Sequence, residues 1–255
     1  MEGLLVAGGP LVLSGDQHGA PCQVALRHCT LVPGWDTEPL RGARWGGRPS
    51  VICDSASVAL RIDHSIVGPL QCGGAGGSLR LVDSIVDGGH AAALALADQH
   101  QGAAMLAATI LRTTIIGLAQ LDVLVLAENV LFLGPLLVGC RSQGKLRHCY
   151  LAAGARTPGR EHCQPARPDA ASWGERQRLQ PRFRSLRYGD QDYGKLAPEC
   201  AWEVACGADD GAEMGAYHDL HRSSLMLARV VPVRRQGRGL APMVMRESDR
   251  RECVA

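Results

Sequence analysis

The chain has 255 residues, a formal net charge of +2 and 46% apolar residues. This balance excludes a chain that is disordered throughout, and it gives no support to strong binding of polyanions through net charge. Aromatic residues make up only 4% of the chain, so aliphatic side chains must form the core, which suits narrow stacked strands better than a large ligand pocket.

The first two-thirds of the chain repeats one short pattern of apolar residues around a polar pair. The repeats are Leu26–Val32, Ile62–Val67, Leu81–Val86, Leu111–Ile116, Ala127–Phe132 and Leu146–Leu151. Aligned on Thr30, Ser65, Ser84, Thr114, Val130 and Tyr150, they are separated by 35, 19, 30, 16 and 20 residues. Repetition at such intervals indicates a solenoid, in which each unit buries its apolar face only against its neighbours.

Alternating or continuous short apolar runs that end at glycine predict strands within each repeat. Unequal spacing with one core-facing pattern predicts an all-β fold, a right-handed parallel β-helix over residues 1–155. We expect an interior ladder of Leu31, Ile66, Ile85, Ile115 and Leu131. Two alternatives remain open: a β-sandwich, which the scarcity of hairpin turns disfavours, and an amphipathic helix over Ala91–Ala108, which Gly102 weakens.

The remainder of the chain divides into three parts. Residues 156–181 are rich in Pro, Arg, Gln and Gly, and predict a linker or strap lying along the solenoid. Residues 182–222 form a region of short helices, which we expect within Tyr193–Cys206 and Glu213–His221. The arginine-rich residues 223–255 predict a disordered tail, and Trp35–Pro49 predicts a loop that protrudes from the solenoid.

The cysteines and the N-terminus bear on location. The ten cysteines form no CxxC pair, which favours free thiols in a reducing cytoplasm over a disulfide framework. Basic residues are nearly all arginine, a bias that we interpret as a bacterial coding sequence. The stretch Met1–Leu13 lacks a basic start and is interrupted by glycine and proline, so we expect no signal peptide. We therefore expect a bacterial cytoplasmic protein, or one carried in an extracellular particle.

Several motifs in the second half resemble one bacterial family of large, poorly characterised proteins. They are Arg156-Thr157-Pro158, Cys163-Gln164-Pro165, Pro181-Arg182-Phe183, Tyr188-Gly189-Asp190 and the run from Gly207 to Ala216. In that family a right-handed β-helix precedes the same strap and helical motif, and some members are labelled phage-tail-like. The resemblance covers residues 20–222 and implies no activity. After His221 the sequence departs from the family pattern, as a fragment or a chain with a shifted reading frame would.

Two groups of residues are candidates for chemistry. Asp63, Asp83 and Asp87 are candidate catalytic carboxylates, since Asp63 and Asp83 fall one residue apart in register and could approach each other. The plainer interpretation is that they are solvated outward positions. The candidate binding residues are His64, Asp209, Asp210, Glu213 and His218.

The second group contains ligand types that metals use, with His218 and His221 at i, i+3. However, Asp209-Asp210-Gly211 is also typical of a helix N-terminal cap, so we expect no metal site and no cofactor. The repeated pair in His28-Cys29 and His148-Cys149 indicates a strand pattern and not a nucleophile.

The sequence therefore predicts a non-enzymatic β-solenoid, a structural or interaction module such as a component of a phage-tail-like assembly. The alternative is a polysaccharide-binding or polysaccharide-cleaving enzyme of the pectin-lyase-like kind. We expect a larger assembly or a partner subunit to cap the end of the solenoid, with polysaccharide as the ligand in the alternative, and neither nucleic acid nor membrane as a partner.

Overall fold

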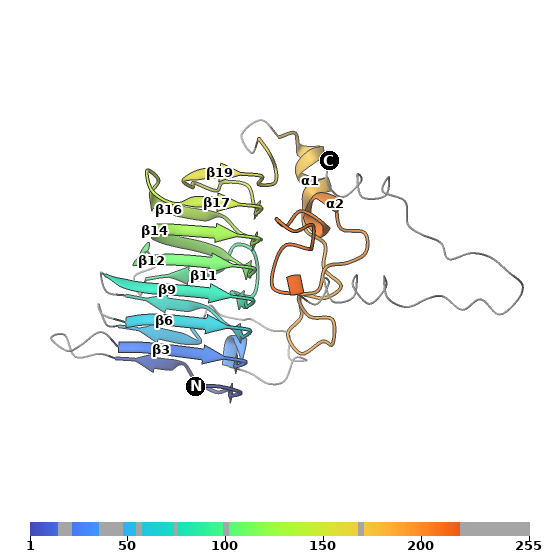
Figure 1. The fold of residues 1–255 in the computed structure, drawn as a ribbon. Coiled ribbons are helices and arrows are strands. Elements are labelled where there is room, and N and C mark those ends of the chain that lie inside the picture. The colour runs from blue at the N-terminus through green and yellow to red at the C-terminus, as the bar shows by residue number, and fades with distance from the viewer. Residues whose placement is uncertain are drawn as a thin grey trace, which may run out of the picture.

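Parallel strands stack into a β-solenoid, along one side of which a C-terminal extension runs (Figure 1). The structure is a computed structural model that describes residues 1–14, 22–35, 48–54, 58–73, 76–98, 102–167 and 171–219. This confirms the prediction of an all-β parallel solenoid with a short, partly helical extension. Most of the expected loop Trp35–Pro49 and the expected tail 223–255 lie outside the described residues.

The smaller sheet has seven short parallel strands, one from each coil. In spatial order they are β1 (Leu5–Val6), β4 (Thr30–Leu31), β7 (Ile66–Val67), β10 (Ile85–Asp87), β13 (Thr114–Ile116), β15 (Leu131–Phe132) and β18 (Tyr150–Leu151). Non-consecutive strands are neighbours because the chain completes one coil between each pair, as parallel pairing requires.

The larger sheet has twelve strands and bends around the rest of the coil. Its main path is β2 (Leu11–Leu13), β5 (Val51–Cys53), β8 (Leu70–Cys72), β11 (Leu94–Ala97), β14 (Leu118–Glu128), β12 (Ala104–Leu111), β9 (Gly77–Val82), β6 (Val58–Asp63) and β3 (Cys22–Arg27). The strands β16 (Leu136–Cys140) and β17 (Lys145–Arg147) pair with β14, and β19 (Gly159–Glu161) pairs with β17. The long strand β14 belongs to both arms of this sheet. The region expected as an alternative helix, Ala91–Ala108, contains β11 and most of β12.

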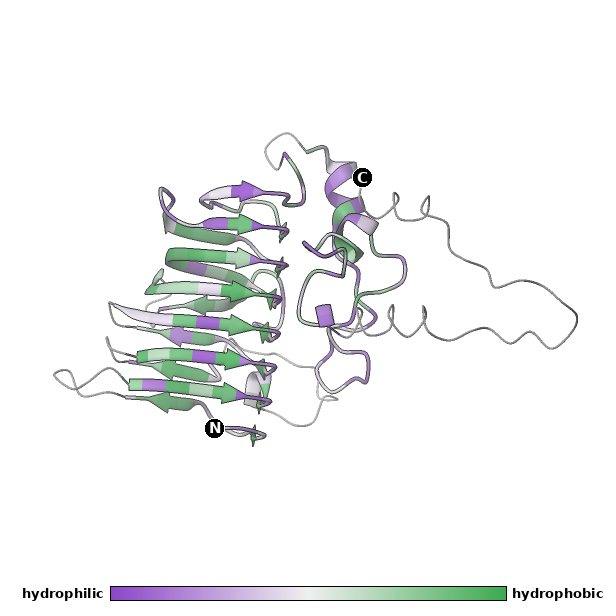
Figure 2. Ribbon diagram, viewed as in Figure 1, coloured by the Kyte–Doolittle hydropathy of each residue, from purple (hydrophilic) through white to green (hydrophobic). Residues whose placement is uncertain are grey.

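The interior is a thin aliphatic column, and hydrophobic residues alternate with polar ones along the strands (Figure 2). In the smaller sheet the buried inward positions are in register from coil to coil: Leu31, Val67, Val86, Ile115, Phe132 and Leu151. Each coil thus buries its apolar face against the coils above and below it.

The expected interior ladder is only partly right. Leu31 and Ile115 lie in the interior, but Ile66, Ile85 and Leu131 occupy the preceding position in the register, so they belong to the opposite face of the sheet. The repeat alignment matches Ser84 with Thr114 because both carry hydroxyls. In the structure Thr114 pairs with Ile85, so this alignment is one residue off. A slip of one residue moves a side chain to the other face of a strand.

Strand stacking continues past residue 155. Within the stretch expected to be a strap, β19 pairs with β17, and Gln164 forms a bridge to Tyr150. The helix α1 (Trp173–Leu179) follows, with Ser172 as its N-cap accepting a hydrogen bond from the backbone N–H of Glu175.

The C-terminal segment, defined here as residues 171–219, covers the outer face of the smaller sheet (Figure 1). The helix α2 (Trp202–Ala205) lies within the expected range Tyr193–Cys206. The helix expected over Glu213–His221 is wrong for most of its described residues, which form turns. The reason is local, because Gly215 has a φ of +100°, which a helix cannot accommodate.

Candidate functional site

A column of polar residues marks one corner of the solenoid, where each coil turns from the larger sheet into the smaller one. All seven have positive φ values, between 43° and 56°: His28, His64, Asp83, Arg112, Asn129, His148 and His162. We call them the corner column. Asn, Asp and His tolerate this left-handed conformation better than other residues with a Cβ, which explains the repeated choice. Backbone hydrogen bonds join neighbouring corners, as from His64 N–H to the Val82 carbonyl at 3.0 Å.

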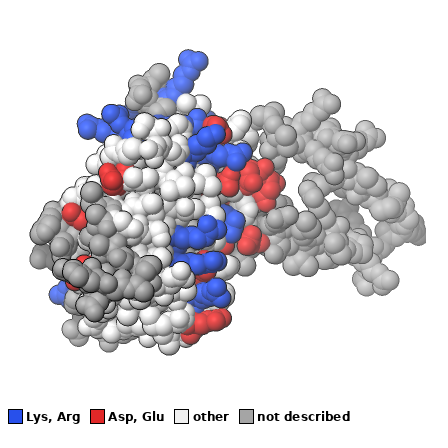
Figure 3. Space-filling model, turned by 60° about the vertical axis from the view of Figure 1, so that its left-hand side comes forward, with Lys and Arg blue, Asp and Glu red and all other residues white. Residues whose placement is uncertain are grey.

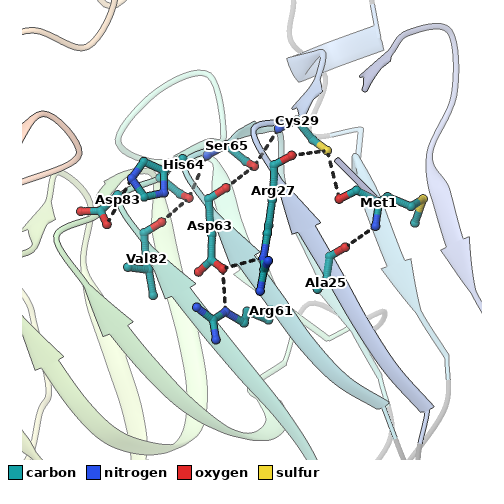
Figure 4. A network of polar contacts seen from close by, with 11 residues as sticks. Met1, Ala25, Arg27, Cys29, Arg61, Asp63, His64, Ser65, Val82 and Asp83 are labelled. Atoms are coloured by element: carbon teal, nitrogen blue, oxygen red, sulfur yellow. Dashed lines mark hydrogen bonds and ion pairs between the residues drawn. The ribbon is translucent and has the colours of Figure 1, made fainter. Parts of the chain in front are cut away.

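At every corner but Asn129, which Val130 follows, the next residue carries a hydroxyl or thiol that binds backbone groups at the bend. Ser65 Oγ donates to the Asp63 carbonyl at 2.7 Å and accepts from Cys29 N–H at 3.0 Å, and Ser84 Oγ accepts from Ser65 N–H at 3.1 Å (Figure 4). Cys149 and Cys163 occupy the same position in later coils, each with its Sγ donating to the carbonyl two residues earlier. These side chains stabilise the corner, because buried backbone groups left unpaired are costly.

The pattern His-Cys is therefore structural. The rings of His148 and His162 stack outside the corner with centroids 5.0 Å apart, whereas Cys149 and Cys163 are buried in the core. Burial raises the pKa of the Cys149 thiol, whereas the interaction with the Cys149 side chain lowers the pKa of Cys163. Histidine and cysteine point to opposite sides of the chain, so they cannot act together on one substrate or metal ion.

Asp63 and Asp83 are each held by arginine. Asp63 Oδ2 lies 2.6 Å from Arg61 Nε and 3.6 Å from Arg27 Nε, and its Oδ1 is buried without a hydrogen-bond partner (Figure 4). Arg112 binds both oxygens of Asp83, at 2.5 and 2.8 Å.

His64, the candidate binding residue next to Asp63, has its Nε2 3.7 Å from Asp83, and its ring contacts that of His28 in a tilted arrangement. Asp63 pairs in register with Val82, so the two carboxylates are one position apart, as the repeat alignment indicated. Neither presents the exposed carboxylate oxygens that acid–base catalysis on a bound substrate needs.

The sequence interpretation missed these arginine partners, although a signal for one of them exists. Arg61 and Asp63 are two residues apart on one strand, so their side chains share a face. Arg112 is 29 residues from Asp83, and only the correct coil register brings them together.

Asp87 anchors the C-terminal segment. It ends β10 on the outer face, where its Oδ2 accepts from the Tyr193 hydroxyl at 2.5 Å and its Oδ1 accepts from Gly89 N–H at 2.7 Å. Burial raises the pKa of Asp87, and the hydrogen bond from Tyr193 only partly offsets it. Burial and the neighbouring carboxylate together raise the pKa of Tyr193 well above its usual value. The candidate catalytic residue Asp87 thus lies beneath the segment.

Three further contacts hold the C-terminal segment to successive coils. The side chain of Asn129, the only asparagine in the chain, donates to Asp209 Oδ1 at 2.6 Å and accepts from Asp209 N–H at 3.2 Å. His148 Nδ1 lies 3.1 Å from the Gly207 carbonyl, and Thr114 Oγ1 accepts from Ala216 N–H at 3.1 Å. The segment is thus bound by the outer face of the smaller sheet and by two residues of the corner column, Asn129 and His148.

The candidate binding residues of the segment lie in one loop. Asp210 Oδ1 accepts from Ala212 N–H at 3.0 Å, and its Oδ2 lies 3.3 Å from Nε2 of the buried His218. His218 Nδ1 lies 3.0 Å from the backbone carbonyl of Glu213. Burial raises the pKa of the Glu213 carboxyl to about 7. Burial acts to raise the pKa of Asp209. The hydrogen bond from Asn129 and the nearby His148 and His218 have the larger combined effect, so the pKa of Asp209 is lowered.

Among the described residues, two clusters each bring three potential ligand atoms within 4.8 Å of one another. One is His64, Asp83 and Asp219, and the other is Asp209, Asp210 and His218. Exposed arginine side chains form a third polar feature. Arg61 and Arg80 are register neighbours on the outside of the larger sheet, and basic and acidic residues form a band along the stack (Figure 3).

In comparisons with known proteins, no family model, no curated protein and no solved structure matches this chain. Within the described part of the chain, the helices are too short and too polar for any of them to cross a bilayer.

Proposed function

We propose that this chain is a non-enzymatic structural or interaction module, in which the first coil of the solenoid docks against strands of a partner subunit in a larger assembly. The observation that carries this proposal is the unpaired edge of the first coil, together with the exposed apolar side chains on its strands. Leu5 in β1 is 66% exposed and Val12 in β2 is 51% exposed, and Met1 and Leu4 beside them are also exposed.

Strand pairing at this end supports the same conclusion. Among the described residues, β1 pairs only with β4 and β2 pairs only with β5. A strand with one neighbour presents backbone donors and acceptors that another strand can pair with, and proteins that need to stay apart place charges or proline there. The apolar side chains of β1 and β2 fit a covered end better than a solvated one.

Two further facts favour a module without catalysis. The candidate carboxylates are engaged by arginine or tyrosine, as described above, and the outer face of the smaller sheet is covered by the chain's own C-terminal segment. The resemblance to a family with members labelled phage-tail-like supports an assembly of that kind.

Replacing exposed apolar side chains of the first coil with lysine tests the proposal. We expect the full chain to associate in a concentration-dependent manner in sedimentation velocity, and Leu5→Lys and Val12→Lys to give monomers. Val125→Lys is the matched control, because Val125 is 50% exposed but lies in the middle strand β14. A wild-type chain that stays monomeric at high concentration, and forms no complex with the products of neighbouring genes, would remove the proposal.

Polysaccharide binding is the second candidate, favoured by the exposed register neighbours Arg61 and Arg80. Spaced cationic side chains suit an acidic chain lying along the stack. A screen of acidic and neutral polysaccharides with the wild-type chain and with Asp63→Ala and Asp83→Ala distinguishes the candidates. Turnover that either substitution abolishes would favour the enzyme, and binding lost only in Arg61→Ala would favour a binding module.

A further inference from the structure

The buried His218 places both ring nitrogens opposite acceptors. Its Nδ1 lies 3.0 Å from the Glu213 carbonyl, its Nε2 lies 3.3 Å from Asp210 Oδ2, and the residue is 4% exposed. A carbonyl can only accept, so Nδ1 carries the proton. In a neutral ring Nε2 then has a lone pair that faces a carboxylate. A proton shared by the two atoms, or a metal ion bound by both, would relieve the repulsion between this lone pair and the carboxylate.

The distance between His218 Nε2 and Asp210 Oδ2 also matches that between two ligands of one metal ion. A charge-assisted N–H···O⁻ hydrogen bond spans about 2.7–2.9 Å. Two ligands bound to one tetrahedral ion at about 2.0–2.2 Å lie roughly 3.3–3.6 Å apart. The 3.3 Å between His218 Nε2 and Asp210 Oδ2 fits the second geometry.

We propose that Asp209, Asp210 and His218 bind a divalent metal ion of the zinc type. The three residues bring one ligand atom each within 4.8 Å of the other two. One imidazole nitrogen and two carboxylates are a donor set that Zn²⁺ accepts, with the fourth position filled by water.

The surroundings of the three ligands have the form of a second coordination shell. The Glu213 carbonyl fixes the tautomer of His218, the amide of Asn129 orients Asp209, and Ala212 N–H orients Asp210. Metal-binding histidines characteristically donate their other ring N–H to a carbonyl or carboxylate, and such partners tune affinity. The bound ion clamps the loop 209–218 shut at the place where Asn129 attaches it to the solenoid.

The neighbouring cluster of His64, Asp83 and Asp219 does not share these properties. Arg112 already binds both oxygens of Asp83, so a second cation there would lie beside a guanidinium group. Asp83 therefore already has a cationic partner, and we place the metal ion at the cluster around His218.

The experiment uses the full chain, stripped with a chelator, loaded with Zn²⁺ under reducing conditions and desalted. We expect one zinc per chain by elemental analysis and a rise in the unfolding temperature on loading. Asp210→Asn should weaken Zn²⁺ binding at least about 10-fold, because even loss of an outer-shell partner costs that much. This variant keeps the turn, since an asparagine oxygen still accepts from Ala212 N–H. His218→Ala should abolish binding.

His90→Ala is the matched control, because His90 is an exposed histidine outside the site, and its affinity should stay within two-fold of wild type. Co²⁺ substitution distinguishes this site from the cysteines, because nitrogen and oxygen ligands give d–d bands without thiolate charge transfer. Three results would overturn the proposal: no stoichiometric metal, a Co²⁺ spectrum dominated by thiolate, or unchanged affinity in Asp210→Asn. Stability that responds to pH but not to Zn²⁺ would instead identify a simple imidazolium–carboxylate pair.

Discussion

Ile85 tests whether the outer face of the smaller sheet binds the C-terminal segment. It is 2% exposed and packs with Tyr193 and Ile116 between the sheet and the segment. Ile85→Ala removes three carbon atoms, each worth about 0.8 kcal/mol of transfer free energy, and leaves a cavity that adds to the cost. We therefore expect the segment to bind about 3 kcal/mol more weakly, which corresponds to a roughly 100-fold larger population of the detached state.

Limited proteolysis with trypsin measures this population, since the exposed Arg182, Arg184 and Arg187 lie within the segment. When opening and closing are fast, cleavage follows the equilibrium population of the open form. We expect cleavage at these sites to accelerate by about two orders of magnitude in Ile85→Ala, with little change in the melting of the sheet.

Ile115→Ala is the matched control, because the same truncation there falls in the interior. It should lower the melting temperature of the sheet itself. The reasoning fails if Ile85→Ala leaves cleavage between residues 182 and 187 within two-fold of wild type, or if the two variants behave alike.

Three further predictions concern the corner column and the C-terminal segment. Gly215→Ala should weaken attachment of the C-terminal segment by about 2 kcal/mol in urea denaturation, because φ is +100° and the new Cβ would lie 2.7 Å from the Thr114 hydroxyl. The control is Gly174→Ala, in a helix with open space around it, which should instead stabilise the protein by about 0.5–1 kcal/mol. Asp83→Asn should lower the free energy of unfolding by about 1–3 kcal/mol. A double-mutant cycle with Arg112→Ala should assign most of this loss to the ion pair, and additive losses in the two single variants would contradict that assignment. Burial raises the folded-state pKa of Asp87 above its ordinary 3.8, so its stabilising contribution is complete below pH 3.8 and is lost as pH rises through the folded pKa. Asp87→Asn should therefore flatten the pH profile of stability above pH 4, and an unchanged profile would show that another group causes it.

The fold class could be predicted from the repeats, because a solenoid repeats its local interactions and each coil carries the same apolar pattern. The register could not be predicted to the residue. In Cys29-Thr30 and Thr113-Thr114, two adjacent positions both accept small polar residues, one turned inward at the corner and one on the outer face. Only pairing with Ile66 and Ile85 resolves the ambiguity, and those residues look apolar enough for the interior.

The outer face of the smaller sheet explains why the sequence places Ile66, Ile85 and Leu131 in the interior. Ile66, Ile85 and Leu131 are apolar because the extension covers them, and a pattern of period two cannot tell burial in the core from burial under a later segment. The candidate residues Asp209, Asp210 and His218 do lie together, although by way of turns around Gly215 and not along a helix.

The C-terminal segment is attached to four successive coils, and this attachment limits where the solenoid can gain or lose a coil. Asp87, Thr114, Asn129 and His148, each from a different coil, hold four different points of residues 193–216. Adding or deleting a coil between Asp87 and His148 would displace one anchor by a full strand spacing of about 4.8 Å, too far for its hydrogen bond to persist. The coils before β10 carry none of these four anchors. We therefore expect natural variation in coil number to be confined to the N-terminal part of the solenoid.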